Sequence, residues 1–278
     1  MLGKCLKHEW IETWMVGLLC CAGVMLISIL AFFLLPLIPK LSESEVGIYV
    51  LPVLILTLVI MGVAAFGGAL FIGRYFFFYR YYKNLFTDQG YLMHTLPVET
   101  SDLINSKLIV ALIWQYLIAV SYFVAILFTS AGFYGMFSDD YTSYVEFIKS
   151  VIEGIGLLYS VGKLEIILFA ACAIIYPIMD MMLLFLAVAF GQLGKKNRFI
   201  LSIVALIGIS FVKKFVTNIV SLISAIFSYS DYNTESALDM VQTHYGIMLA
   251  LILVLETAAI IGAYVLNLHM VKNKLNLE

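Results

Sequence analysis

Ionisable residues interrupt several of the long apolar runs in this sequence. Asp180 follows Pro177 in one run, and Glu256 lies near the middle of another. Lys213 and Lys214 are neighbours near the middle of a third run. A charged side chain at the centre of a bilayer costs about 2.5–3.5 kcal/mol on insertion scales, so such residues are usually paired or functional. These residues could therefore form ion pairs, line a water-filled pathway or, for the two acids, relay protons.

The run that contains the two lysines also has a polar face. Lys213, Thr217, Ser221 and Ser224 recur at spacings of 4, 4 and 3, as on one side of a helix, and Lys214 and Asn218 flank them. Three interpretations remain open. Lys213 or Lys214 pairs with Glu256 or Asp180 inside the bundle, or the polar face lines a transport pathway, or the run breaks near Lys213 and its second half lies at an interface.

The composition indicates that these runs cross a membrane. The chain has 278 residues, of which 63% are hydrophobic and only 12% charged. A soluble domain of this length would need more polar surface, whereas apolar runs of about 20 residues are long enough to span a bilayer as helices. We expect an all-α integral membrane protein, a single transmembrane domain over residues 1–278, with six spans at about 14–38, 48–73, 108–132, 164–190, 199–227 and 245–268.

Three further helical features accompany these spans. The segment LKHEWIETW carries Trp10 and Trp14, which are typical of a membrane boundary, and predicts a short interfacial helix that bends into the first span. Apolar residues at helical spacing predict an amphipathic outer helix over about 143–160. In the second span, Ala65, Ala69 and Gly73 recur every fourth residue, a spacing of small residues that lets helices approach closely.

The distribution of Lys and Arg predicts the orientation of the spans. Cytoplasmic connections of multi-pass proteins are enriched in these residues. Most of them fall on one side of the predicted topology: Lys4, Lys7, Arg74, Arg80, Lys83, Lys107, Lys195, Lys196, Arg198, Lys272 and Lys274. The opposite side carries only Lys40, Lys149 and Lys163. Both termini and the segment 74–107 are therefore expected on the cytoplasmic side.

The stretch YRYYKNLFTDQGYLMHTLPVETSDLINSK, from Tyr79 to Lys107, is polar but keeps large apolar side chains. It predicts a short cytoplasmic helix over QGYLMHTL, ended by Pro97, and a second helix that leads into the third span. Exposed apolar side chains on such a helix either contact a partner or pack against the ends of the spans.

This stretch resembles the coupling segment of ABC-2 type exporter permeases, especially the six-span permeases of Gram-positive bacteria. The matching positions are Tyr82, Lys83, Gln89, Gly90, Leu92, Leu96, Pro97, Val98, Ser106 and Lys107. Gln89 stands where those permeases often have Glu. The resemblance implies that the region around Gln89–Leu96 docks on an ATP-hydrolysing subunit. The residues expected to couple to that subunit are Tyr82, Lys83, Leu85, Phe86, Gln89, Gly90, Tyr91, Leu92, Leu96 and Pro97.

The resemblance implies a permease subunit of an ATP-driven exporter in the bacterial cytoplasmic membrane. Two permease copies, identical or paralogous, would work with two ABC ATP-binding subunits to export a hydrophobic or amphipathic peptide, drug or lipid. The sequence has no G-x-x-x-x-G-K-[ST] motif, so we expect no cofactor on this chain, with ATP and Mg bound by the partner subunit.

Other classes of protein find less support in the sequence. No G-x-S-x-G motif occurs, and HEWIE has Glu12 where a zinc motif needs its second His, so we expect neither an enzyme nor a metal site. The net charge of −2 gives no reason to expect nucleic-acid binding. Two alternatives stay open: a proton-coupled secondary transporter that uses Asp180 and Glu256, and a non-transporting membrane scaffold or sensor subunit.

Overall fold

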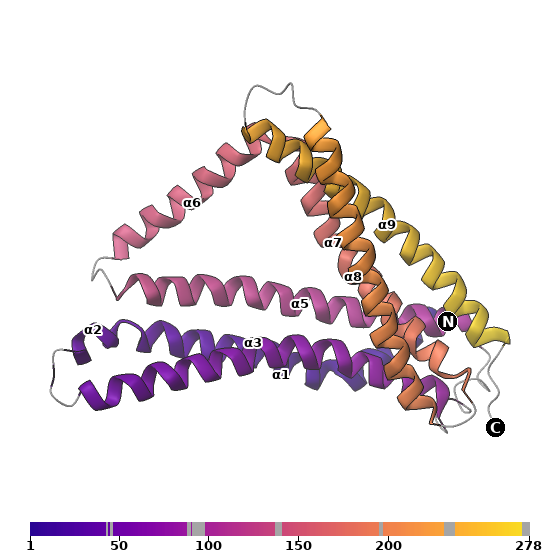
Figure 1. Cartoon of the computed structure of the whole chain (residues 1–278). Coiled ribbons are helices and arrows are strands. Elements are labelled where there is room, and N and C mark those ends of the chain that lie inside the picture. Colours follow the sequence, from indigo (N-terminus) through magenta and orange to yellow (C-terminus); the bar gives the residue numbers. More distant parts are fainter. Residues whose placement is uncertain are drawn as a thin grey trace. The chain divides into compact units, whose positions relative to one another are not determined.

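A computed structural model describes residues 1–42, 44, 47–87, 90, 98–136, 141–194, 197–230 and 237–273 of the chain. None of these residues lies in a strand, and almost all lie in helices (Figure 1). The helices are α1 Leu2–Leu34, α2 Leu37–Ser42, α3 Gly47–Phe86, α5 Thr100–Tyr134, α6 Tyr141–Val161, α7 Lys163–Gly191, α8 Arg198–Ser230 and α9 Ala237–Asn273.

Six helices in the described part of the chain are long and apolar enough to cross a membrane: α1, α3, α5, α7, α8 and α9. The all-helical fold and the number of candidate spans are thus confirmed. The helices run past the expected spans, since α3 continues to Phe86 and α1 begins at Leu2 without a break before its apolar part. The separate interfacial helix expected at the N-terminus is therefore not confirmed, whereas the helix expected over 143–160 is present as α6.

The described residues form two compact units. The first contains residues 1–6, 78–112 and 156–278, and the second contains residues 7–77 and 113–155. Because α1, α3, α5 and α6 contribute residues to both units, the division does not separate two segments of the chain. The single transmembrane domain expected from the sequence stays a prediction, and each unit is described below by itself.

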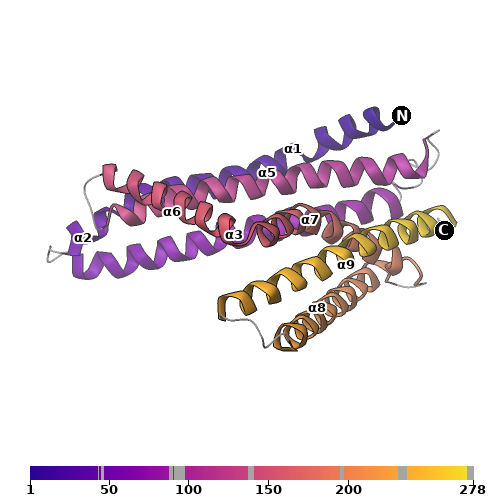
Figure 2. The same ribbon diagram turned by 90° about the horizontal axis from the view of Figure 1, so that it is seen from above.

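The first unit is built on α7, α8 and α9, which pack against one another in pairs. Figures 1 and 2 show α8 and α9 side by side. Helices α7 and α8 approach closely at Gly191, where an added Cβ atom would lie 1.9 Å from the hydroxyl oxygen of Ser202. The Ser202 hydroxyl donates a hydrogen bond to the carbonyl of Val188 at 3.3 Å. A glycine and a serine thus allow the two backbones to meet, as is common between membrane helices.

In the second unit, α1 and α3 both pack on α5. Figure 2 shows α1 and α5 running side by side. The Trp10 and Trp114 rings stack with centroids 4.8 Å apart, and the Trp114 indole donates to the Thr13 hydroxyl at 3.2 Å. Cys20, Val24, Ala69, Ile118 and Ala125 form a buried apolar cluster between these helices. The predicted close approach along α3 is confirmed at its last two positions, since Ala69 is buried in this cluster and a Cβ on Gly73 would lie 2.9 Å from Ile118.

The contact between α1 and α5 yields a first prediction. A Cβ atom on Gly17 would lie 2.2 Å from the Trp114 ring, whereas a Cβ on Gly23 of the same helix would meet nothing within 4 Å. Gly17→Ala should therefore lower the free energy of unfolding by about 1–3 kcal/mol through overpacking. Gly23→Ala should leave it unchanged or raise it slightly, because alanine favours helix. Thermal unfolding of the two variants in detergent measures the difference, and equal midpoints would contradict the contact between Gly17 and Trp114.

Candidate functional site

A largely buried ion pair joins α7 and α8 in the first unit. The Lys213 ammonium lies 2.8 Å from Oδ1 of Asp180, donates to the hydroxyl oxygen of Tyr176 at 2.9 Å, and sits 4.4 Å from the centroid of the Tyr176 ring. Tyr176 and Asp180 are one helical turn apart on α7, so both can reach the same ammonium. All three residues lie within helices long and apolar enough to span a membrane. The pair thus neutralises two charges that would be costly to bury separately.

Of the pairings left open by the sequence, the structure forms the one between Lys213 and Asp180. Helix α8 continues without interruption from Arg198 to Ser230. The interpretation in which the run breaks near Lys213 is therefore wrong. The physical reason is that a continuous helix keeps every backbone hydrogen bond satisfied in lipid, and Asp180 removes the need for the Lys213 ammonium to reach water.

Glu256 of α9 is buried in the same unit, with 5% of its surface exposed. It interacts electrostatically with Lys213 of α8 and with Cys172 of α7. Its Oε2 atom accepts no hydrogen bond from any residue that the structure describes. The ammonium of Lys213 forms its ion pair with Asp180 rather than with Glu256, so a second carboxyl group lies beside a pair that is already complete.

The polar face of α8 divides into a buried part and an exposed part. Ser224 is fully buried, and its hydroxyl donates to the carbonyl of Ser221 at 2.9 Å. Lys214, Thr217 and Asn218 are exposed, and the Thr217 hydroxyl donates to the carbonyl of Lys213 at 3.0 Å. Exposed polar side chains in the middle of a span need water or a protein neighbour rather than lipid. This surface, formed by Lys214, Thr217 and Asn218, is called the α8 polar surface below.

The last turns of α3 are attached to α7 and α9. The Tyr81 ring stacks on Phe185 of α7, with centroids 4.0 Å apart and planes 4° from parallel. Its hydroxyl donates to Oδ1 of Asn267 on α9 at 3.1 Å. Only 1% of the Tyr81 surface is exposed, so its ring is packed and its hydroxyl group is hydrogen-bonded inside the unit. We call this three-residue contact the Tyr81 anchor.

Sequence reasoning missed the Tyr81 anchor, although two signals were available. Phe78, Tyr81 and Leu85 recur at spacings of three and four at the end of α3, as on the buried face of a helix. Asn267 is a lone amide in an apolar run, and buried amides usually have a specific partner. Only the fold, however, shows that this partner comes from α3.

The residues expected to couple to an ATPase are placed in different surroundings. Leu85 and Phe86 are buried within the chain itself, and their coupling to an ATPase stays a prediction. The Tyr82 ring packs on the Phe199 ring, with centroids 5.1 Å apart, and the Lys83 side chain is exposed. Gly90 is buried, and a Cβ there would lie 2.4 Å from the carbonyl oxygen of Leu85. The remaining expected positions lie outside the described residues: Gln89, Tyr91, Leu92, Leu96 and Pro97.

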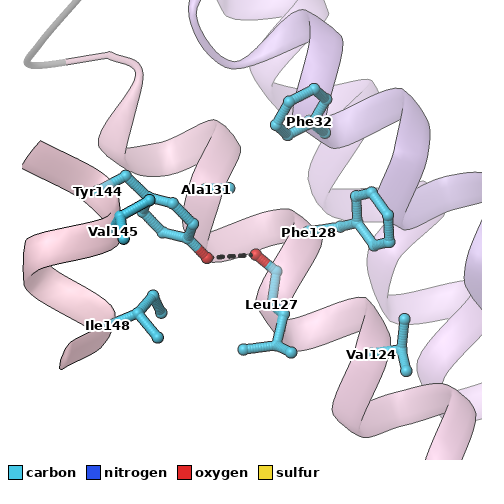
Figure 3. Close-up of a pocket in the computed structure, with 8 residues that line it drawn as sticks. All are labelled: Phe32, Val124, Leu127, Phe128, Ala131, Tyr144, Val145 and Ile148. Carbon is cyan, nitrogen blue, oxygen red and sulfur yellow. Dashed lines mark hydrogen bonds between the residues drawn. The ribbon is translucent and has the colours of Figure 1, made fainter. Parts of the chain in front are cut away.

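An apolar groove of about 470 Å³ lies in the second unit, between α6 and the ends of α1 and α5. Figure 3 shows the Tyr144 side chain crossing from α6 to α5, where its hydroxyl donates to the carbonyl of Leu127 at 2.9 Å. The lining residues are almost all hydrophobic: Phe32, Val124, Leu127, Phe128, Ala131, Tyr144, Val145 and Ile148. The groove could receive a hydrocarbon chain, and sequence reasoning did not predict it.

No family model, curated protein or solved structure matches this chain. Within the part of the chain that the structure describes, no group of three or more His, Cys, Asp and Glu residues is arranged to hold a metal ion. The chemistry that the described residues do offer is ionic: a Lys–Asp pair, a neighbouring carboxyl group and an exposed polar surface, all on helices long and apolar enough to span a membrane.

The ion pair yields a second prediction. Lys213→Met leaves Asp180 buried without its partner and should lower the free energy of unfolding by about 3–5 kcal/mol. Replacing both partners, as in Lys213→Met with Asp180→Leu, should restore most of this loss, because no charge is then buried alone. Lys214→Met is the matched control and should have little effect, since Lys214 is exposed. Unfolding in mixed detergent and SDS micelles measures these values. Equal losses for Lys213→Met and Lys214→Met would rule out the pair.

Proposed function

We propose that this chain is the permease subunit of an ABC-2 type exporter in a bacterial cytoplasmic membrane. Three observations support the proposal: six helices long enough to span a membrane, the resemblance of residues 79–107 to a coupling segment, and the attachment of the end of α3 to α7 and α9. ATP and Mg would be bound by a separate ATP-binding subunit. Two permease copies, identical or paralogous, would form the complete transporter, with both termini on the cytoplasmic side.

The observation that carries the proposal is the Tyr81 anchor. The proposed docking segment follows α3 directly, and the last turns of α3 are fixed to α7 and α9 through a ring stack and a buried hydrogen bond. A displacement of that segment by an ATPase would therefore pass through Tyr81 to the helices that hold the ion pair.

The exposure of the α8 polar surface favours a second permease copy or a water-filled pathway next to it. Lys214, Thr217 and Asn218 would be poorly placed against hydrocarbon. A face of this kind is suited to a central cavity between two permeases. The substrate class, a hydrophobic or amphipathic peptide, drug or lipid, rests on the resemblance, and the apolar groove beside α6 is compatible with such cargo.

A proton-coupled secondary transporter is the second candidate, and the burial of both Asp180 and Glu256 in one unit favours it. The two candidates differ in their energy source. The purified chain in liposomes would transport cargo in response to a proton gradient if it were a secondary transporter. An exporter subunit would transport only with its ATPase and ATP.

The coupling proposal yields a third prediction, which concerns Gly90. Gly90→Ala places a methyl group against the main chain at Leu85, so the segment beyond α3 must shift. An overpacking cost of about 1–3 kcal/mol would weaken the correct docked arrangement about 5–150-fold. We expect the variant to insert normally but to lose cargo-stimulated ATP hydrolysis in the complex purified from the native host.

The matched control for this experiment is Gly67→Ala. Gly67 lies on α3, and a Cβ there would meet nothing within 4 Å, so hydrolysis should stay near the wild-type rate. Unchanged stimulation in Gly90→Ala would contradict a coupling role for this segment. Purification of the chain from its host without any ATPase would contradict the proposed function as a whole.

A fourth prediction tests whether the α8 polar surface meets water. Single cysteines are introduced at Thr217, Ser224 and Phe215 in a chain whose four native cysteines are replaced. Thr217→Cys should react with a membrane-impermeant thiol reagent in at least one nucleotide state, because the reactive thiolate forms in water. Ser224→Cys is buried and should be protected, and Phe215→Cys, exposed on the apolar side, should be shielded by lipid. Protection of Thr217→Cys in every state would exclude the pathway interpretation.

A further inference from the structure

Glu256 presents an unusual combination of charge and surroundings. It lies near the middle of the candidate span Thr243–Lys272, and 5% of its surface is exposed. An ionised carboxylate is only an acceptor and needs donors on both oxygens. The Oε2 atom of Glu256 finds no donor among the residues that the structure describes.

The groups that face Glu256 from the neighbouring helices have other partners. From α8, the Lys213 ammonium donates to Asp180 and to Tyr176, both of α7. Also from α7, the Cys172 thiol donates to the carbonyl of Leu249 at 3.6 Å. On α9 itself, the adjacent hydroxyl of Thr257 donates to the carbonyl of Val254 at 2.9 Å. The ammonium and the thiol that interact with Glu256 therefore both have other partners, and the positive charge of Lys213 is already matched by Asp180.

An ionised carboxylate in such a place would be an uncompensated negative charge in apolar surroundings. Burial of an unpaired charge is so unfavourable that the group takes up a proton instead. A proton needs no cavity and no set of ligands, whereas a metal ion would need several oxygen or nitrogen donors. The neutral acid also gains an O–H group that can donate to a main-chain carbonyl.

We propose that Glu256 is a proton-binding site, held as a neutral carboxylic acid beside the Lys213–Asp180 pair, so that the three side chains together carry no net charge. The two acids thus have different roles: Asp180 accepts a hydrogen bond from the Lys213 ammonium, and Glu256 carries the exchangeable proton. When the proton leaves, Glu256 becomes a second carboxylate that competes with Asp180 for Lys213. Proton binding is thereby linked to the contact between α7 and α8. The inference holds for either candidate function.

The test uses dicyclohexylcarbodiimide, an apolar reagent that modifies protonated carboxyl groups within membranes. The carboxyl oxygen adds to the central carbon of the reagent and the proton moves to a nitrogen, so an ionised carboxylate reacts poorly. The full-length protein in nanodiscs is treated over a range of pH, and the modified peptides are quantified by mass spectrometry. We expect modification at Glu256 around neutral pH, decreasing as the pH rises, and several-fold less modification at Asp180.

Two variants complete the experiment with a readout that is independent of the reagent. Glu256→Gln copies the neutral acid and should keep the unfolding midpoint of the wild type. Asp180→Asn removes a real charge and should lower the midpoint clearly. The proposal is overturned if Glu256 stays unmodified at every pH tested, or if Glu256→Gln lowers the midpoint as much as Asp180→Asn does.

Discussion

The contact between Lys213 and Asp180 determines how α8 is oriented in its unit. A lysine in the middle of an apolar span must reach an anion or water, and here it reaches an anion on α7 at 2.8 Å. Because the ammonium is fixed, the rotation of α8 about its axis is fixed with it. That rotation buries Ser224 and leaves Lys214, Thr217 and Asn218 on the outside. The exposed position of the α8 polar surface is therefore a consequence of the ion pair.

The Tyr81 anchor extends the same unit toward the segment that resembles a coupling helix. Tyr81 contacts α7 through Phe185 and α9 through Asn267, while the ion pair joins α7 to α8. The end of α3 and the middle of α8 are thus connected through α7 by buried contacts. If a partner displaces residues 79–107, these contacts are a physical route by which the displacement reaches the middle of α8. Contiguous packing supplies the route, whereas energetic coupling along it has to be measured with variants such as Gly90→Ala.

The sequence predicted the six candidate spans well but their ends poorly, for a physical reason. Hydropathy marks only the apolar part of a helix, so it could not show that α3 continues to Phe86 or that α1 starts at Leu2. It also offered two acids and two lysines without deciding between pairings, because the choice depends on helix rotation and packing. Composition alone also cannot separate an apolar side chain that awaits a partner from one that packs on its own chain, so it could not show that Leu85 and Phe86 are buried.

A charged group that is paired and an acid that is neutralised by a proton make different contributions to a membrane protein. The Lys213–Asp180 pair resists change, because separating its members would leave two charges in apolar surroundings. Glu256 can gain or lose one charge without separation of that pair, since its Oε2 atom accepts no hydrogen bond within the described part of the chain. The unit therefore combines a fixed electrostatic link with an adjacent variable one. In such an arrangement a single proton can alter how strongly Glu256 of α9 competes with Asp180 of α7 for Lys213, while the packing at Gly191 and Tyr81 keeps α7, α8 and α9 together.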